Sequence, residues 1–161
     1  MGQAKELERA FALAYRALNA RDRTEHELRA FLERKAADSA AIDAAIAELA
    51  AIGAIDDRRY AQRFTADRRS LDHWGSERIA QDLARRGVDR ELIDAALSGV
   101  DRDDELGAAV ELLGGRFPNG LAGDKERDRA WRLLVRRGYE PELAYAAVRR
   151  HGRGFEGHAA A

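Results

Sequence analysis

The sequence repeats itself at a fixed interval of 51 residues, and this period constrains the fold more than any other feature. The first two copies match without a gap at Leu28/Ile79, Leu32/Leu83, Lys35/Arg86, Asp38/Asp89, Ile42/Ile93 and Ile46/Leu97. The third copy continues the pattern at Leu134, Gly138, Leu143 and Val148. Such a period is typical of stacked structural units that present a long binding surface.

The second copy indicates how each unit divides into three helices. Asp57 can cap a first helix that ends near Ser70. A second helix opens at Gly75 and closes at Gly87, a residue that tolerates the left-handed conformation after a helix. Asp89 then caps a third helix. We therefore expect three helices per unit.

The outer copies follow the same pattern of helix starts and ends. Thr24 and Glu27 form a capping-box pair, and Pro141 occupies a first helical position, where proline is favoured. The third copy contains a segment rich in glycine, residues 114–123, which predicts a loop. Residues 153–161 should form a disordered tail.

No segment alternates apolar and polar residues as a half-buried strand does, so the sequence predicts an all-α fold. The expected architecture is a tandem array of three three-helix repeats, each similar to a helix-turn-helix. The predicted boundaries are residues 1–56, 57–100 and 101–152, followed by the tail.

Composition limits the classes of function. The 161 residues carry a formal net charge of −1, so the chain lacks the positive balance of most nonspecific nucleic-acid-binding domains. There is no cysteine for disulfides or thiolate chemistry, no apolar run long enough to cross a bilayer and no secretory signal. We expect a cytoplasmic protein with no membrane partner.

The sequence offers no catalytic, cofactor or metal site. The histidines His26, His73, His151 and His158 lie far apart and are expected at the surface. The acidic clusters precede helices, where carboxylates favour the helix dipole. Neither a phosphate-binding loop nor a nucleophile elbow is present. The protein is therefore not expected to be an enzyme.

Basic pairs recur at the end of the second helix in all three units, at Arg34–Lys35, Arg85–Arg86 and Arg136–Arg137. Two interpretations stay open. Cations favour helix C-termini, which alone would explain the placement. Alternatively, the pairs in stacked units form a stripe that contacts phosphates or an acidic protein surface.

A second candidate contact cluster lies on and after the first helix of the middle unit: Arg58, Arg59, Arg63, Arg68, Arg69 and Trp74. Solvated ion pairs with Asp67 and Asp72 are the alternative explanation for its arginines. Trp74 stands in a polar connection, where exposure and a partner contact are as well supported as packing. The remaining aromatic residues are expected to pack between helices: Tyr60, Phe64, Trp131, Tyr139 and Tyr145.

These residues together resemble the RecX family of bacterial regulatory proteins. The central stretch, residues 56–64, contains an acidic pair, a Tyr-Ala step and a Phe. It is followed by Arg68 and then by the spaced residues of the family's next helix, Gly75, Ile79, Leu83 and Gly87. Arg21, Thr24 and Leu32 in the first unit and Arg136–Tyr139 in the last extend the similarity over about residues 8–150. Ala36 departs from it, because family members usually carry glycine there.

The resemblance implies an elongated, curved, monomeric and non-enzymatic inhibitor of the recombinase RecA, within DNA recombination, repair and the SOS response. Members lie in the groove of the RecA filament on DNA, hinder its growth and reduce ATP hydrolysis, strand exchange and coprotease activity. The alternative is a helical repeat protein that binds DNA without RecA. Its third helices would begin with Ser39–Ala41, Arg90–Glu91 and Pro141–Glu142, which suit base reading poorly. Weak direct DNA binding is compatible with the arginines.

Overall fold

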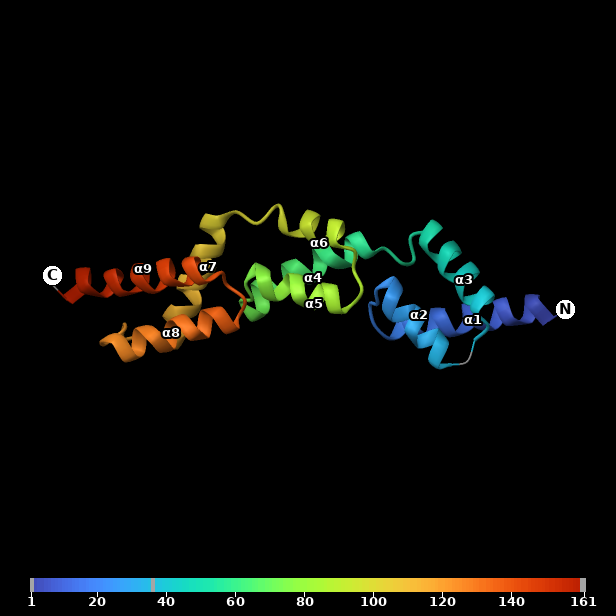
Figure 1. Ribbon diagram of the computed structural model, residues 1–161, viewed down its shortest axis with the longest axis horizontal. Coiled ribbons are helices and arrows are strands. Elements are labelled where there is room, and N and C mark those ends of the chain that lie inside the picture. Colours follow the sequence, from blue (N-terminus) through green and yellow to red (C-terminus); the bar gives the residue numbers. More distant parts are fainter. Residues whose placement is uncertain (1, 36, 160–161) are drawn as a thin grey trace. The chain divides into compact units, whose positions relative to one another are not determined.

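The computed structural model describes residues 2–35 and 37–159, and Ala36 therefore lies outside the described residues (Figure 1). The described residues form helices and no strand, which confirms the all-α prediction. The first group is α1 (Gly2–Ala20), α2 (Glu25–Arg34) and α3 (Ser39–Ala51). The second is α4 (Asp57–Asp72), α5 (Ser76–Arg85) and α6 (Arg90–Leu97). The third is α7 (Arg102–Arg116), α8 (Asp124–Arg136) and α9 (Pro141–Ala159).

The helices belong to two compact units whose boundary passes through α4 and α5. One unit contains residues 1–63 and 83–96, and the other contains residues 64–82 and 97–161. Each unit thus joins one outer repeat to part of the middle repeat. The boundaries predicted for three separate repeats stay a prediction.

In the first unit, α1, α2 and α3 pack on one another around an apolar core (Figure 1). Its buried members are Ala14, Ala17, Leu28, Leu32, Ile42, Ile46, Leu49 and Ile55. In the second unit, α9 packs against both α7 and α8 (Figure 1). Its core consists of Ala109, Leu112, Leu113, Ala130, Leu134, Tyr139, Leu143, Ala144, Ala147 and Val148. Equivalent positions of the 51-residue repeat therefore point inward in both outer repeats.

The structure confirms the predicted cap at Thr24 and contradicts the one at Asp57, whereas the predicted cap at Asp89 stays a prediction. Thr24 accepts a hydrogen bond from the Glu27 N–H in a complete capping box, as predicted. The prediction for Asp57 is wrong, because the side chain of Asp56 accepts from the Arg59 N–H at 3.0 Å and caps α4. Asp57 instead accepts from the Glu25 N–H at the start of α2, at 2.9 Å.

Two segments of the third repeat are more helical than the sequence predicts. Helix α7 runs through Gly114 to Arg116, so the loop is shorter than residues 114–123. Leu112 and Leu113 are buried directly before these glycines, and their packing outweighs the cost of glycine in a helix, about 1 kcal/mol per residue.

The second such segment is the end of α9. This helix continues to Ala159 where a disordered tail is expected. His151 is buried, contrary to the surface location expected for it, and its Nε2 lies 3.0 Å from the Phe117 carbonyl oxygen. The ring of Phe155, one turn later, packs edge-on against His151 with centroids 5.2 Å apart. These contacts hold the start of the extension against the 117–123 loop.

The predicted packing of the aromatic residues holds for some and fails for one. Tyr139 and Phe64 are buried, with 1% and 8% of their surface exposed. Tyr60 and Trp131 are half-buried. Tyr145 is 59% exposed and does not belong to the core.

A recurring junction joins the end of the second helix in one repeat to the start of the second helix in the preceding repeat. In the first unit, the Thr24 hydroxyl donates to the Arg86 carbonyl oxygen at 2.6 Å. In the second unit, the Gly75 N–H donates to the Arg137 carbonyl oxygen at 2.8 Å. Thr24 and Gly75 are 51 residues apart, as are the two arginines. Equivalent positions therefore meet at both junctions, through a side-chain hydroxyl in the first and a backbone N–H in the second.

Glycine is needed at this junction for two reasons. Gly87 and Gly138, the residues after each arginine, have φ angles of +78° and +92°, which disfavour any residue with a Cβ. A Cβ on Gly87 would also overlap Cβ and the ring of His26 on α2, and one on Gly138 would overlap Arg78 on α5. The helices can approach this closely only because these side chains are absent.

We predict that Gly87→Ala destabilises the protein more than Gly53→Ala does. Gly53 also has a positive φ, +71°, but a Cβ there would meet no atom within 4 Å. Both substitutions incur the left-handed backbone cost of about 1–2 kcal/mol. Gly87→Ala should cost at least about 1 kcal/mol more in urea unfolding, because it also opens the junction. Equal losses for the two variants would show that the close contact with α2 has no energetic role.

Tyr139 predicts how stability depends on alkaline pH. Its hydroxyl donates to the His73 carbonyl oxygen at 3.0 Å, and burial raises its pKa to about 12. As pH rises from about 10 to 12, the unfolded chain loses this proton while the folded chain keeps it, so the free energy of unfolding falls. The wild type should therefore lose up to about 2–3 kcal/mol more than Tyr139→Phe over this range in urea titrations. If the free energy of unfolding falls equally with pH in both proteins, the pKa of Tyr139 is not raised in the folded state.

Candidate interaction surface

The arginines at the start of α4 divide between structural contacts and exposure. Arg59 donates to the Gly53 carbonyl oxygen at 3.0 Å, and Arg63 pairs with Asp22 at 3.1 Å. Both line a small depression in the first unit. Arg58 is exposed. The pair of Arg63 is itself largely exposed, so it is worth little energy and leaves this charge accessible to a partner.

Trp74, in the connection after α4, lies close to one arginine of α4 and one of α5. The guanidinium carbons of Arg68 and Arg78 lie 5.1 Å and 3.9 Å from its ring centroid. Arg68 also pairs with Asp72 at 2.6 Å, as the alternative explanation of the cluster predicts. Trp74 and Arg69 are both half-buried. Trp74 therefore organises cationic groups and does not project freely from the connection.

The two members of each basic pair have different environments. The inner arginines, Arg86 and Arg137, are half-buried at the junctions. The Arg86 Nη1 atom lies 3.1 Å from both a Glu27 carboxylate oxygen and the Tyr60 hydroxyl oxygen. Arg137 donates to the Asp72 carbonyl oxygen at 2.5 Å. Their backbone carbonyls and their side chains therefore both stabilise the array.

The outer arginines, Arg85 and Arg136, are exposed. Lys35, the first-repeat residue equivalent to the inner arginines, is also exposed. The inner position is half-buried at the two junctions, whereas the outer position is exposed in all three repeats.

Arg136 belongs to an arginine-lined depression in the second unit that the sequence analysis missed. Its other basic members are Arg116, Arg129 and Arg132, beside Phe117 and Leu133. Residues 129, 132 and 136 share one face of α8 by helical spacing, a signal already present in the sequence. Among the residues that the structure describes, no carboxylate lines this depression, and although Arg132 pairs with Asp128, its four arginines favour anions.

Asp57 shows how the first junction handles a partly buried charge. Burial raises its pKa, and the hydrogen bond from the Glu25 N–H partly opposes that effect. Repulsion from Glu25, Asp89 and Asp56 adds to the increase. The carboxylate satisfies an N–H at the beginning of α2 that has no partner within the helix. Its role is structural.

Residues 2–35 and 37–159 contain no group of three or more acidic or histidine side chains that could hold a metal ion. In the same part of the chain, no helix is long and apolar enough to span a membrane. The candidate interaction surfaces described above consist of exposed arginines, several of which lie beside aromatic rings.

Comparison with known proteins identifies the repeats. The RecX second three-helix domain matches residues 56–97, and the RecX first three-helix domain matches residues 10–49. A regulatory protein RecX from Mycolicibacterium vanbaalenii is 34% identical over 152 residues, which cover 89% of this chain and 83% of the relative. Another from Deinococcus radiodurans is 33% identical, with 90% and 69% covered.

Solved structures support the same fold. The crystal structure of RecX from Lactobacillus salivarius superimposes with a TM-score of 0.81 at 18% identity, covering 91% of this chain and 97% of that one. A second crystal structure, of a regulatory protein RecX, gives a TM-score of 0.79 at 20% identity, covering 92% and 74%. The matched three-helix domains, the relatives that align over most of their length and the shared fold show that this chain belongs to the RecX family of regulatory proteins.

Proposed function

We propose that this protein binds the RecA filament on DNA and inhibits filament growth, ATP hydrolysis, strand exchange and coprotease activity. Membership of the RecX family is the observation that carries the proposal. The protein acts without catalysis, as a monomer in the cytoplasm, where RecA filaments form. Its effects on recombination, DNA repair and the SOS response follow from this inhibition.

The repeated junction supports a filament as the partner. A filament presents the same protein surface at regular intervals, and linked repeats can contact several of those surfaces at once. Linked contacts raise the effective concentration of each further contact, so weak individual contacts combine into tight binding. The exposed outer arginines, Arg85 and Arg136, occupy equivalent places in two repeats and are suited to such contacts.

The first prediction from this proposal concerns ATP hydrolysis by RecA. Substoichiometric amounts of the protein should slow RecA's DNA-dependent ATPase, because a few inhibitors that block filament growth affect many protomers. The protein alone should hydrolyse no ATP. A steady-state ATPase assay with and without the protein provides the measurement. An unchanged rate of ATP hydrolysis by RecA at equimolar protein would refute the proposal. Binding of the protein to DNA without any effect on RecA would favour the DNA-binding alternative.

The second prediction separates binding from stability within the basic pairs. The double variant Arg85→Glu/Arg136→Glu should bind RecA filaments about tenfold more weakly, since each exposed charge contact contributes up to about 1 kcal/mol. Its free energy of unfolding should change by less than about 1 kcal/mol, as expected for two surface substitutions. Filament co-sedimentation and urea unfolding provide the two readouts.

The matched variant is Arg86→Ala/Arg137→Ala, which alters the neighbouring residue in each pair. It should lose stability, on the order of 2 kcal/mol or more, because each arginine makes charge-assisted hydrogen bonds at a junction. Filament binding by the wild type should also weaken as salt increases. If the affinity for filaments changes neither with salt nor with charge reversal at Arg85 and Arg136, the outer arginines serve only to stabilise the helix termini.

A further inference from the structure

An open cleft of about 460 Å³ lies between α8 and α9 in the third repeat. Helix α8 contributes Arg127 and Trp131, which are four residues apart, and α9 contributes Tyr145, Arg149 and Arg153, which follow the same spacing. Residues four apart share one face of a helix, so each helix presents an aromatic ring and at least one arginine to this cleft. The buried side chain of Val148 lies between them and makes the floor apolar.

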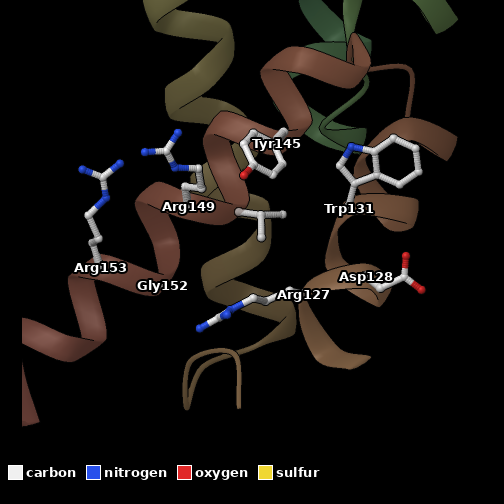
Figure 2. A pocket seen from close by; sticks show the side chains of 8 residues that line it. Arg127, Asp128, Trp131, Tyr145, Arg149, Gly152 and Arg153 are labelled. Atoms are coloured by element: carbon white, nitrogen blue, oxygen red, sulfur yellow. The ribbon is translucent and has the colours of Figure 1, made fainter. Parts of the chain in front are cut away.

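The aromatic rings are held in place although they are not in the core. The Trp131 indole N–H donates to the Pro141 carbonyl oxygen at 3.1 Å, which orients the ring. Tyr145 is 59% exposed, although its ring is large enough to gain from burial. Figure 2 shows these two rings rising from the facing helices at one end of the cleft. An oriented indole beside an exposed phenol offers flat apolar surface to a ligand.

The charge of the cleft is positive. Asp128 also lines the cleft, but its carboxylate points away from the side to which the guanidinium groups of Arg127, Arg149 and Arg153 extend (Figure 2). Asp128 is also paired with Arg132. Arg127 has an ion pair with Asp124 at 3.5 Å, but both side chains are exposed and such a pair is weak. Anionic groups would therefore be attracted to the side where the arginines gather.

The geometry points to a single-stranded nucleic acid as the occupant of this cleft, with bases stacked on Tyr145 and Trp131 and phosphates bound by Arg127, Arg149 and Arg153. A strand supplies flat rings and regularly spaced negative charges together, which is the pattern that aromatic and arginine side chains recognise. Duplex DNA hides the faces of its bases, and an acidic peptide supplies charge without requiring the rings. The inference deepens the proposed function and rests on it for the source of the strand, which would be the DNA of the filament.

The test uses the full chain and a fluorescent single-stranded oligonucleotide without RecA, with anisotropy as the readout. Tyr145→Ala should weaken binding about tenfold, the effect of removing one base stack, whereas Tyr145→Phe should bind like the wild type. Circular dichroism should show unchanged folding, because Tyr145 is exposed. If the alanine variant folds and binds as tightly as the wild type, the stacking site is refuted.

The charge contribution has its own matched control. Arg149→Ala/Arg153→Ala should weaken binding and flatten its salt dependence, since each lost phosphate contact reduces the slope of log K against log salt by about 0.7. Arg16→Ala/Arg90→Ala removes the same charge from exposed sites elsewhere and should change binding much less. Equal effects of the two pairs would mean that only net charge matters, which would overturn the assignment of a site.

Four competitor ligands identify the occupant. An abasic strand, a duplex of the same length and an oligoglutamate peptide should each compete more weakly than the normal strand, and free adenosine monophosphate should compete weakly too. If any of them competes as well as the strand, the proposed occupant is wrong. Because RecA is absent, failure here leaves inhibition of RecA untouched. A failed RecA assay, in turn, would leave binding of the strand in place.

Discussion

The array of repeats depends on the junction contacts, in which the end of the second helix of one repeat meets the start of the second helix of the preceding repeat. Helix ends leave carbonyl and N–H groups without partners inside the helix. At the first junction the Arg86 carbonyl oxygen accepts from the Thr24 hydroxyl, and at the second the Arg137 carbonyl oxygen accepts from the Gly75 N–H at the start of α5. A three-helix repeat buries little apolar surface by itself. Satisfying these polar groups allows its neighbour to complete the packing.

The junction also explains why the basic residues occur in pairs. The inner arginine of each pair is committed to holding two repeats together, whereas the outer one stays on the surface. One short sequence feature, repeated every 51 residues, therefore places a stabilising arginine beside an exposed one at both junctions. The clefts beside α8 add further arginines, and one of the two also contains Arg136, the outer member of a basic pair.

The helices, most caps and the glycines that end the second helices follow from local rules that the sequence displays directly. The errors occur where tertiary contacts decide. The Asp57 side chain accepts a hydrogen bond from α2 and does not cap its own helix, α4. Helix α9 extends past Gly152 because His151 and Phe155 contact the 117–123 loop. Tyr145 has the helical spacing of a core residue but lies outside the core. Which face of a helix turns inward depends on its neighbours, so the aromatic and basic positions of the α8–α9 cleft could be aligned from sequence but not assigned to the surface.

Hydrogen exchange of individual amides, followed by NMR, tests the junction most directly. The N–H groups of Gly75 and Glu77 lie at the start of α5 and donate to the Arg137 and Gly138 carbonyl oxygens at 2.8 Å and 3.1 Å. Amides at such positions ordinarily exchange quickly because they have no partner within the helix. We expect these two to exchange only through extensive unfolding, far more slowly than Lys125 and Glu126 in the first turn of α8, whose cap residue Gly123 makes no side-chain bond. Exchange of Gly75 and Glu77 as fast as that of the α8 amides would contradict a stable junction.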